Sequence, residues 1–552
     1  MGKKIVIVGG VAGGMSAATR LRRLDETAEI VVFEQGPYVS YANCGLPYYV
    51  GGVIADRDAL LLQTPDSLAA RFRVDVRVRH QVLDIDPDRR VVSVLDGGTG
   101  RRGDEGYDEL ILAVGASARA SVPAADLPVH SLRTVQDVDA LAGILDVAGP
   151  TATALVVGGG FIGLEAVENL VLRGVRVVLA QRSPHVLSPL DVEMAAPIEA
   201  ALRAQGVDVR TSTTVEAVDG RTVRLSDGTT LQPDFVVDAS GVVPNVELAR
   251  AAGLRLGPTG GIAVDESNRT SAAHVFAVGD GVEKVDALSE EGALIALAGL
   301  ANRHGRTVAD VISGRDEANS PAFGTSIVKV FGIIAARTGW SERQLQAAGR
   351  PYRAIHTHPF SHATYYPGAQ PMSIKVLVDP ESDAILGAQV VGGDGVDKRI
   401  DVIAVAMAGG VTATGLSRLE LAYAPQFGSA KDPVNQIGYV ADNLRAGTTR
   451  SIQWHELDDA REAGAVLVDV RSVAEHRAGA IPGSINLPLD ELRDLLDEIP
   501  EGRIVVHCQV GQRGHVAARI LSQRGFDVVN LDGGYRTWRD GASAVSHVAT
   551  SV

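Results

Sequence analysis

The chain has 552 residues, and at roughly 150 residues per domain this length predicts three or four domains. Hydrophobic residues make up 45% of the chain and charged residues 22%, which excludes disorder, collagen and a coiled coil as descriptions of the whole protein. With 52 Lys and Arg against 67 Asp and Glu, the formal net charge is −15. A field of that sign repels nucleic acid and acidic lipid, so we expect neither as a partner.

The number of cysteines and the length of the apolar runs exclude further classes of protein. Cys44 and Cys508 are the two cysteines, too few for a disulfide-stapled secreted scaffold or for a zinc site built from CxxC pairs. The apolar run at the N-terminus is interrupted by Gly9, so it predicts a first strand and lacks the length of a signal peptide. Since no run approaches the roughly 18 apolar residues of a membrane helix, we expect a cytoplasmic protein.

A strand, a glycine-rich turn, a helix and a second strand follow one another twice in the first third of the chain. One such turn is weak evidence, but two in the same context predict two Rossmann-like dinucleotide-binding folds. Two such folds indicate two nucleotide cofactors, most simply a flavin and a nicotinamide that exchange electrons. The strands are expected at 5–8, 30–33, 154–157 and 175–179, and the helices at 15–24 and 164–173.

The first turn is an imperfect dinucleotide fingerprint, because Val11 replaces its middle glycine. A helix that starts near Gly14 still directs its N-terminal amides toward a pyrophosphate. Glu34 ends the next strand, where a carboxylate can accept hydrogen bonds from ribose hydroxyls. The cofactor contacts predicted in this turn are Gly9, Gly10, Val11, Ala12, Gly13 and Gly14.

The second turn is a complete fingerprint, but no acidic residue follows the next strand. Such an acid would bind the ribose 2′-hydroxyl and repel a 2′-phosphate, whereas Gln181 and Arg182 do neither. We therefore expect NADPH to be accepted alongside NADH; the alternative is that Arg182 points into solvent. The residues predicted to bind the nicotinamide nucleotide are Gly158, Gly160, Phe161, Ile162, Gly163, Gln181 and Arg182.

Beyond residue 325 the pattern changes to strands typical of an antiparallel sheet, followed by a helix, a linker and a further compact α/β segment. The expected strands are 326–331, 373–378 and 384–391, the helix is 400–408, the linker is 443–451, and the last segment is 452–546.

Residues 107–116 and 274–280 extend the dinucleotide-binding pattern. The chain here resembles the flavoprotein disulfide reductases that carry two dinucleotide domains. The resemblance implies that FAD is bound and that Asp280 contacts its ribityl chain and pyrophosphate. It also places further residues near the flavin, namely Val82, Ala113, Val114, Gly115, Leu297 and Ala298.

The segment Ser-Tyr-Ala-Asn-Cys-Gly-Leu-Pro-Tyr-Tyr begins at Ser40 and contains Cys44. A lone cysteine is often only a small buried hydrophobe, but this order resembles the single-cysteine branch of that family. The branch contains NADH oxidases, NADH peroxidases and coenzyme A-disulfide reductases. Peroxide-reducing members carry a histidine where this chain has Ala12, so peroxidase activity is disfavoured, and the motif with Asn43 is most similar to the coenzyme A-disulfide reductases.

That resemblance implies a Cys44 thiolate beside the flavin ring, favoured by the helix N-terminus that follows it and by charge transfer to the oxidised flavin. It also implies a homodimer in which tyrosines cross the interface toward the thiol, where a phenol can protonate a departing thiolate. Of Tyr365 and Tyr366 the sequence cannot choose one. The implied catalytic tyrosines are Tyr365, Tyr366 and Tyr423, and the implied contacts to coenzyme A are Arg20, Arg23, Ser40 and Asn43.

The last hundred residues or so resemble a single-domain rhodanese. Cys508 follows a predicted strand and opens a loop into a helix. Backbone amides of that loop, with Arg513, would stabilise a thiolate and then a persulfide. An inactive rhodanese-like module usually lacks this cysteine, so the segment predicts an active sulfur-handling domain.

We therefore expect an α/β protein that contains two Rossmann-like domains, an α+β dimerisation domain with an antiparallel sheet, and a C-terminal α/β rhodanese domain. The expected function is reduction by NAD(P)H, FAD and Cys44 of coenzyme A disulfide, coenzyme A persulfide or polysulfide, with Cys508 delivering sulfane sulfur. The alternatives are an oxygen-reducing NADH oxidase, a sulfurtransferase with a regulatory flavoprotein, and a non-enzymatic redox-sensing scaffold. The expected boundaries are 1–125 with 250–325 for the FAD domain, 126–249 for the NAD(P)H domain, 326–445 for dimerisation and 451–546 for the rhodanese.

Overall fold

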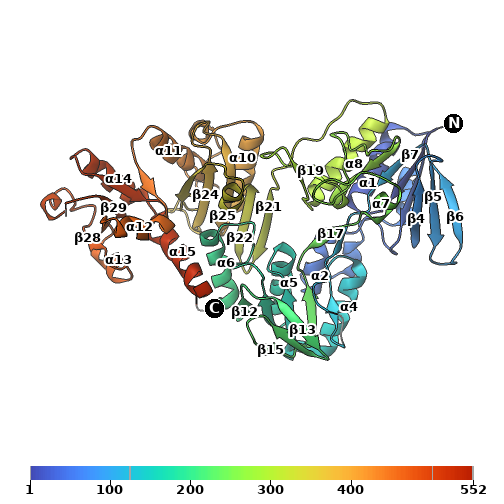
Figure 1. Cartoon of the computed structure of the whole chain (residues 1–552), viewed down its shortest axis with the longest axis horizontal. Coiled ribbons are helices and arrows are strands. Elements are labelled where there is room, and N and C mark those ends of the chain that lie inside the picture. The colour runs from blue at the N-terminus through green and yellow to red at the C-terminus, as the bar shows by residue number, and fades with distance from the viewer. Residues whose placement is uncertain (1, 124–125, 500, 550–552) are drawn as a thin grey trace. The chain divides into compact units, whose positions relative to one another are not determined.

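The structure is a computed structural model that describes residues 2–123, 126–499 and 501–549 (Figure 1). The chain divides into two compact units. One contains Met1–Leu179 and Thr214–Gly324, and the other contains Ala180–Thr213 and Thr325–Val552. These two units do not correspond one to one with the four predicted domains, so the predicted domain boundaries stay predictions. No helix in the described part of the chain combines the length and the apolar composition needed to span a bilayer.

The first unit begins with a parallel sheet buried on both faces. Because successive side chains of a strand point to opposite faces, Ile5 and Ile7 pack with helices on one side, whereas Val6 and Val8 join the core on the other. The sheet order is β18 (Val275–Ala277), β7 (Glu109–Leu112), β1 (Lys4–Val8), β2 (Glu29–Glu34) and β3 (Asp75–Val78). Helices α1 (Ala12–Leu24) and α8 (Ala298–Ile312) pack against each other, and β4 (His80–Asp86), β5 (Val91–Asp96) and β6 (Arg102–Gly106) form a separate antiparallel sheet.

A second parallel sheet repeats this plan within the same unit. Within it, neighbouring strands follow the order β11 (Arg176–Ala180), β10 (Thr153–Val157), β16 (Phe235–Asp238) and β9 (Val129–His130). Its helices are α4 (Val135–Ala148) and α5 (Phe161–Leu172), and a small antiparallel sheet is made by β13 (Val215–Asp219), β14 (Thr222–Leu225) and β15 (Thr230–Leu231). Two dinucleotide-type folds, as predicted, therefore occur in one chain.

Both helices that follow the glycine turns start earlier than predicted, at Ala12 instead of 15 and at Phe161 instead of 164. The glycines lie inside the first helical turn because the chain is too crowded there for a side chain. A Cβ on Gly14 would lie 2.0 Å from the carbonyl oxygen of Gly9, and one on Gly163 would lie 1.8 Å from that of Gly158.

The second unit contains a five-stranded antiparallel sheet, as predicted beyond residue 325. Its order is β21 (Ser326–Val330), β22 (Ile333–Gly339), β25 (Ile385–Gly392), β24 (Met372–Val378) and β23 (Arg353–Thr357). Its helices are α6 (Val192–Ala204), α9 (Glu342–Ala347), α10 (Val396–Ala408) and α11 (Pro433–Arg445). The predicted linker at 443–451 is too long: its first three residues belong to α11, which Asp432 caps and whose buried face continues to Ala441.

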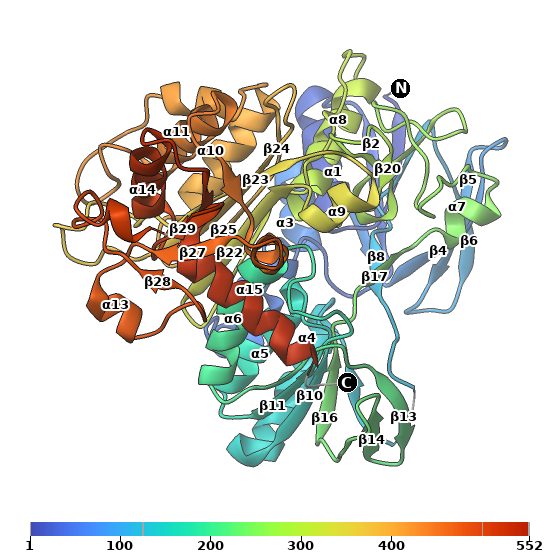
Figure 2. The ribbon, with the colours of Figure 1, turned by 60° about the vertical axis from the view of Figure 1, so that its left-hand side comes forward.

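The C-terminal segment of this unit is a parallel sheet with flanking helices. The strands are β26 (Ser451–Ile452), β30 (Val528–Leu531), β29 (Ile504–His507), β27 (Val466–Asp469) and β28 (Ile485–Asn486), in that order. The helices are α12 (Leu457–Glu462), α13 (Val473–Arg477), α14 (Gln512–Ser522) and α15 (Gly534–Ala549). Figure 2 shows α15 in red alongside α6 in green, and the two helices are in contact.

A buried charge network lies within the second unit. The ammonium group of Lys375 is fully buried and contacts Asp191 at 2.9 Å, Glu342 at 2.8 Å and also Glu193. His356 continues the network, since its Nε2 lies 3.1 Å from Glu193 and its Nδ1 lies 2.7 Å from Asp532. Burial alone would lower the pKa of His356, but its bonds to Asp532 and Glu193 raise that pKa to about 9. The imidazole is therefore a cation at neutral pH and links β23 to the C-terminal segment.

Candidate active sites

The predicted flavin contacts follow the carboxyl ends of strands in one parallel sheet. Gly9 follows β1, Glu34 ends β2, Ala113 follows β7, and Asp280 lies just beyond β18. Carboxyl ends of parallel strands meet at one edge of a sheet, where such folds bind nucleotides. The sheet order β18-β7-β1-β2 makes these segments neighbours, so the structure brings the predicted residues together.

The local geometry fits FAD. Helix α1 has no side chain that caps its N-terminus and no acid in its first turn, which leaves its amides available to a pyrophosphate. Glu34 accepts from the amides of Gly10 at 2.9 Å and Gly36 at 2.7 Å, which fixes its carboxylate beside the glycine turn. Asp280 lies 3.6 Å from the guanidinium of Arg133.

The remaining predicted flavin contacts take different positions. Val82 is buried in the core of the unit, so its backbone and not its side chain is what a flavin could meet. Val114 and Gly115 follow β7, and the carbonyl of Val114 accepts a bond from Asn245. Leu297 and Ala298 form the start of α8.

The second glycine turn opens α5, which again has no capping side chain and no acid in its first turn. A Cβ built on Gly160 would meet nothing within 4 Å, so the backbone is open to a close ligand. Gly163 is buried against the turn, while Phe161 and Ile162 are half-buried at the helix start. In the other unit Gln181 is buried and bonds to the carbonyl of His185, whereas Arg182 is exposed.

Cys44 lies in a short helical turn, Asn43–Gly45, and is exposed. Its segment is tied to the predicted flavin site at two points. The amide of Ser40 donates to the carbonyl of Gly10 at 2.8 Å, and the side chain of Asn43 donates to the carbonyl of Arg133 at 3.0 Å. The loop that carries Cys44 is therefore attached to the first glycine turn through Ser40, and Ser40 and Asn43 hold this loop in place.

Stabilisation of the Cys44 thiolate by the following helix and by an oxidised flavin stays a prediction. The helix after Cys44, α2 (Leu46–Val50), has only five residues. Loss of hydration raises the pKa of the Cys44 thiol, and the negative charge of Glu165 raises it further. The charge of Arg133 lowers this pKa, whereas that of Asp280 raises it. The residues present thus favour the neutral thiol.

Glu165 and Tyr48 form a pair near Cys44 that the sequence did not reveal. The phenol of Tyr48 on α2 donates to Glu165 on α5 at 3.1 Å, and the two helices are in contact. Burial raises the pKa of Glu165, and burial followed by Glu165 raises the pKa of Tyr48. Nothing near Cys44 in the sequence signals a carboxylate from another helix.

We expect the substitution Glu165→Gln to lower the pKa of Cys44, by on the order of one unit or less, because it removes a negative charge that opposes the thiolate. The measurement is the pH dependence of Cys44 alkylation by iodoacetamide, in a Cys508→Ser background. Glu168→Gln is the control: it removes the same charge from the same helix, and the charge of Glu168 acts on Tyr48 and Glu165. An unchanged alkylation midpoint in Glu165→Gln would contradict the assignment.

Arginines gather where α1 packs against α8. Arg20 donates to Asp310 at 2.7 Å, and Arg306 and Arg315 lie 3.8 Å and 3.6 Å from the same carboxylate. Three arginines thus surround one buried acid beside a pocket of about 200 Å³, and the charged residues that line this pocket are Arg303, Arg306, Asp310 and Glu317. Arg23 is exposed on α1. The sequence analysis singled out Arg20, whose role stays a prediction, but not Arg303 and Arg306 of α8, whose spacing of three residues was the available signal.

The structure distinguishes the three predicted tyrosines. The hydroxyls of Tyr365 and Tyr423 are 2.8 Å apart, and both side chains are exposed. Tyr366 instead packs edge-on against His362, with ring centroids 5.7 Å apart. Tyr365 is therefore the residue that pairs with Tyr423.

The second thiol, Cys508, follows β29 directly and precedes α14. Its side chain is fully buried. Its carbonyl accepts from the amide of Tyr535 at 2.8 Å, and the amide of Arg536 donates to the carbonyl of Gln509 at 3.0 Å. Arg513 in the first turn of α14 binds Glu475 through both guanidinium nitrogens, and its raised pKa reflects first Glu475 and also the nearby Cys508.

Comparisons with known proteins agree with this geometry. The pyridine nucleotide-disulphide oxidoreductase family matches residues 3–305, its dimerisation domain matches 325–433, and the rhodanese-like domain matches 453–540. A coenzyme A disulfide reductase of Staphylococcus aureus is 34% identical over 439 residues, which are 79% of this chain and 99% of that protein.

Two solved structures are similar over nearly the whole chain. Reduced Bacillus anthracis CoADR-RHD is 44% identical with a TM-score of 0.96, covering 98% of this chain and 99% of that one. An NAD-dependent persulfide reductase from A. fulgidus is 36% identical with a TM-score of 0.91, covering 97% and 100%. The chain therefore belongs to the pyridine nucleotide-disulphide oxidoreductase family, as a flavoprotein reductase that uses FAD and NAD(P)H and carries a C-terminal rhodanese domain.

Proposed function

We propose that this enzyme reduces sulfur–sulfur bonds of coenzyme A disulfide, coenzyme A persulfide or polysulfide at Cys44, and that Cys508 supplies sulfane sulfur. The observation that carries the proposal is the anchoring of the Cys44 loop on the glycine turn of a dinucleotide fold, through the bond from Ser40 to Gly10. The chain has one other cysteine, Cys508, so Cys44 works without a neighbouring partner thiol in its own loop.

Cys44 acts as the nucleophile. Its thiolate attacks one sulfur of the substrate, a Cys44–S–S–R bond forms, and the other sulfur leaves as a thiolate that takes up a proton. When bound, FAD would supply two electrons drawn from the nicotinamide; with them the S–S bond at Cys44 breaks, Cys44 returns to its thiolate, and the bound sulfur leaves as a thiol or as hydrogen sulfide. Because the protein groups around Cys44 favour the neutral thiol, the deprotonated state has to be favoured by what binds beside it.

The arginine cluster of α1 and α8 supports coenzyme A as the carrier of the reacting sulfur. Coenzyme A carries phosphates at one end and a thiol at the other, so a cluster of arginines is suited to its phosphates. Arg20, Arg23, Arg303 and Arg306 are the residues that we assign to those phosphates. Arg20 already donates to Asp310. It would therefore attract the phosphates through its positive charge more than through two free hydrogen-bond donors.

The exposed tyrosine pair supports a homodimer. Tyr365 and Tyr423 lie on the part of the chain that matches the dimerisation domain, and exposed Phe427 lies close to Tyr423 in sequence. Exposed aromatic groups on such a domain are typical of a surface that another chain covers. We assign to this pair the donation of a proton to the departing thiolate in the partner's site.

The test is NAD(P)H consumption by the holoenzyme with coenzyme A disulfide, coenzyme A persulfide, polysulfide or oxygen as the acceptor. We expect at least one sulfur acceptor to be reduced about 100-fold faster than oxygen, since a thiol beside a flavin is suited to S–S cleavage. Stoichiometric oxygen consumption that continues at full rate without a sulfur acceptor would replace the proposal with an NADH oxidase. Running each reaction with NADH and with NADPH tests the cofactor tolerance predicted from the missing acid at this position, where Gln181 and Arg182 stand.

A further inference from the structure

The loop that follows Cys508 has a single cationic side chain. It reads Cys-Gln-Val-Gly-Gln-Arg-Gly, and the cation is Arg513. Arg513 is therefore the charged group of this loop that a sulfur donor at Cys508 would meet. Whether Arg513 is paired with a carboxylate determines how much negative charge of the donor it can stabilise.

Arg513 is held by a carboxylate from a different helix. Its Nη1 and Nη2 donate to the two oxygens of Glu475 at 2.8 Å and 2.6 Å. Ser472 fixes the same carboxylate, because its amide and hydroxyl both donate to Glu475 at 3.0 Å. Bidentate pairs of this kind are directional and among the stronger ion pairs. The bonds to Arg513 lower the pKa of Glu475 to about 2, so the carboxylate stays charged at working pH.

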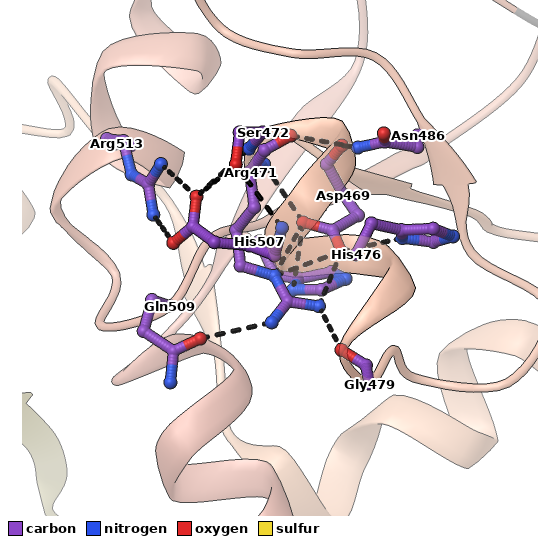
Figure 3. Close-up of polar contacts among 10 residues, drawn as sticks. Asp469, Arg471, Ser472, His476, Gly479, Asn486, His507, Gln509 and Arg513 are labelled. Carbon is purple, nitrogen blue, oxygen red and sulfur yellow. Dashed lines mark hydrogen bonds and ion pairs between the residues drawn. The ribbon is translucent and has the colours of Figure 1, made fainter.

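The other cations near Cys508 are engaged as well. Figure 3 shows the guanidinium of Arg471 between Asp469, which it binds at 2.7 Å, and Gln509, which it binds at 3.0 Å. His507 precedes Cys508, and burial lowers its pKa to about 4, so it is neutral. Burial lowers the pKa of Arg536, and the charge of Asp540 opposes that shift. Arg513 and Arg471 are thus the arginines near this loop that a carboxylate binds directly.

Donors differ in the charge that their leaving group develops. With thiosulfate, the Cys508 thiolate takes the outer sulfur, the S–S bond breaks, and Cys508–S–S⁻ and the sulfite dianion result. With an alkyl persulfide, R–S–SH, the thiolate takes the outer sulfur, the proton moves to the departing sulfur, and Cys508–S–S⁻ and R–SH result. The first route places two negative charges at the loop and requires an available cation, whereas the second does not.

We infer that Glu475 is a positioning residue that sets donor specificity: by holding Arg513 in an ion pair, it directs Cys508 toward alkyl persulfides and away from dianionic donors such as thiosulfate. The inference rests on the proposed function, in which Cys508 accepts sulfane sulfur. It adds the class of the donor and the residue that selects it.

The experiment measures persulfide formation on Cys508 by intact mass, with thiosulfate or glutathione persulfide as the donor. The full chain carries Cys44→Ser so that Cys508 is the reacting thiol, and NAD(P)H is omitted. We expect glutathione persulfide to react at least about 100-fold faster than thiosulfate, and Glu475→Gln to raise the thiosulfate-to-persulfide rate ratio about tenfold by freeing Arg513. The thiosulfate gain should appear in the concentration for half-maximal rate, which a purely structural effect would not shift for one donor alone.

Glu491→Gln is the matched control, because it removes the same charge from an exposed acid of the same domain. A wild-type preference for thiosulfate, or an unchanged ratio in a folded Glu475→Gln variant, would overturn the inference. If Glu475→Gln does not fold, the donor preference of the wild-type Cys508 still tests the inference, because a preference for thiosulfate would overturn it. Reduction of coenzyme A disulfide by the Glu475→Gln variant with Cys44 intact is measured separately, so that failure of the proposed function is distinguished from failure of this inference.

Discussion

Cys44→Ser is expected to lower kcat/KM for NAD(P)H-dependent reduction of sulfur substrates by at least about 10³-fold, since loss of a nucleophile removes the covalent route altogether. The serine hydroxyl is nearly isosteric but is not deprotonated at neutral pH. Steady-state NAD(P)H oxidation with coenzyme A disulfide and with polysulfide measures the loss. Anaerobic bleaching of the flavin by NAD(P)H should stay within about threefold of wild type, because the nucleotide turns are unchanged.

Cys508→Ser is the matched control for this prediction. The substitution is the same, but Cys508 lies in the second unit within the rhodanese segment, so reduction of coenzyme A disulfide should persist. Acceptance of sulfur from external persulfide should be lost instead. Retained disulfide reduction in Cys44→Ser would exclude Cys44 as the nucleophile.

Lys375→Met is expected to lower the free energy of unfolding by about 3–5 kcal/mol, because removal of one partner leaves buried charges uncompensated. The ammonium group is fully buried among Asp191, Glu193 and Glu342. Methionine fills a similar volume but supplies no charge. The measurement is denaturant unfolding of the full chain, read from the first transition.

Lys329→Met is the control for this stability prediction, since Lys329 is exposed on β21 of the same sheet. Its effect should remain within about 0.5 kcal/mol, as for most surface substitutions. A Lys375→Met variant whose stability lies within about 1 kcal/mol of wild type would show that the three carboxylates take up protons or water at little cost.

The local pattern of the sequence was sufficient for the two dinucleotide folds and for the places of the key residues along them. Glu34 could be located because it ends a recognisable buried strand, and Gly158 because it follows one. Cys508 could be located for the same reason, between a strand and a helix. Alternation of apolar residues and the spacing of glycines act over a few residues, so a sequence displays them directly.

The first residues of the helices and the pKa values of the site residues were harder to predict from the sequence. The helices at Ala12 and Phe161 begin earlier than the periodicity predicted, because glycines that usually break helices are required there by close backbone contacts. A Cys44 thiolate was predicted from the following helix, but α2 is short, and loss of hydration, followed by the charge of Glu165, raises the pKa of the thiol. The pKa of a thiol depends on charges from every packed element, which a local motif does not reveal.

By itself, the sequence determined the fold class, the two glycine turns and the two thiols, since each depends on residues adjacent along the chain. The contacts between distant residues became known only from the tertiary structure: Glu165 acts on Cys44, Arg306 pairs with Asp310, and Glu475 binds Arg513. These contacts join residues that are far apart in the chain, and their energies depend on burial and distance, which exist only once the chain has folded.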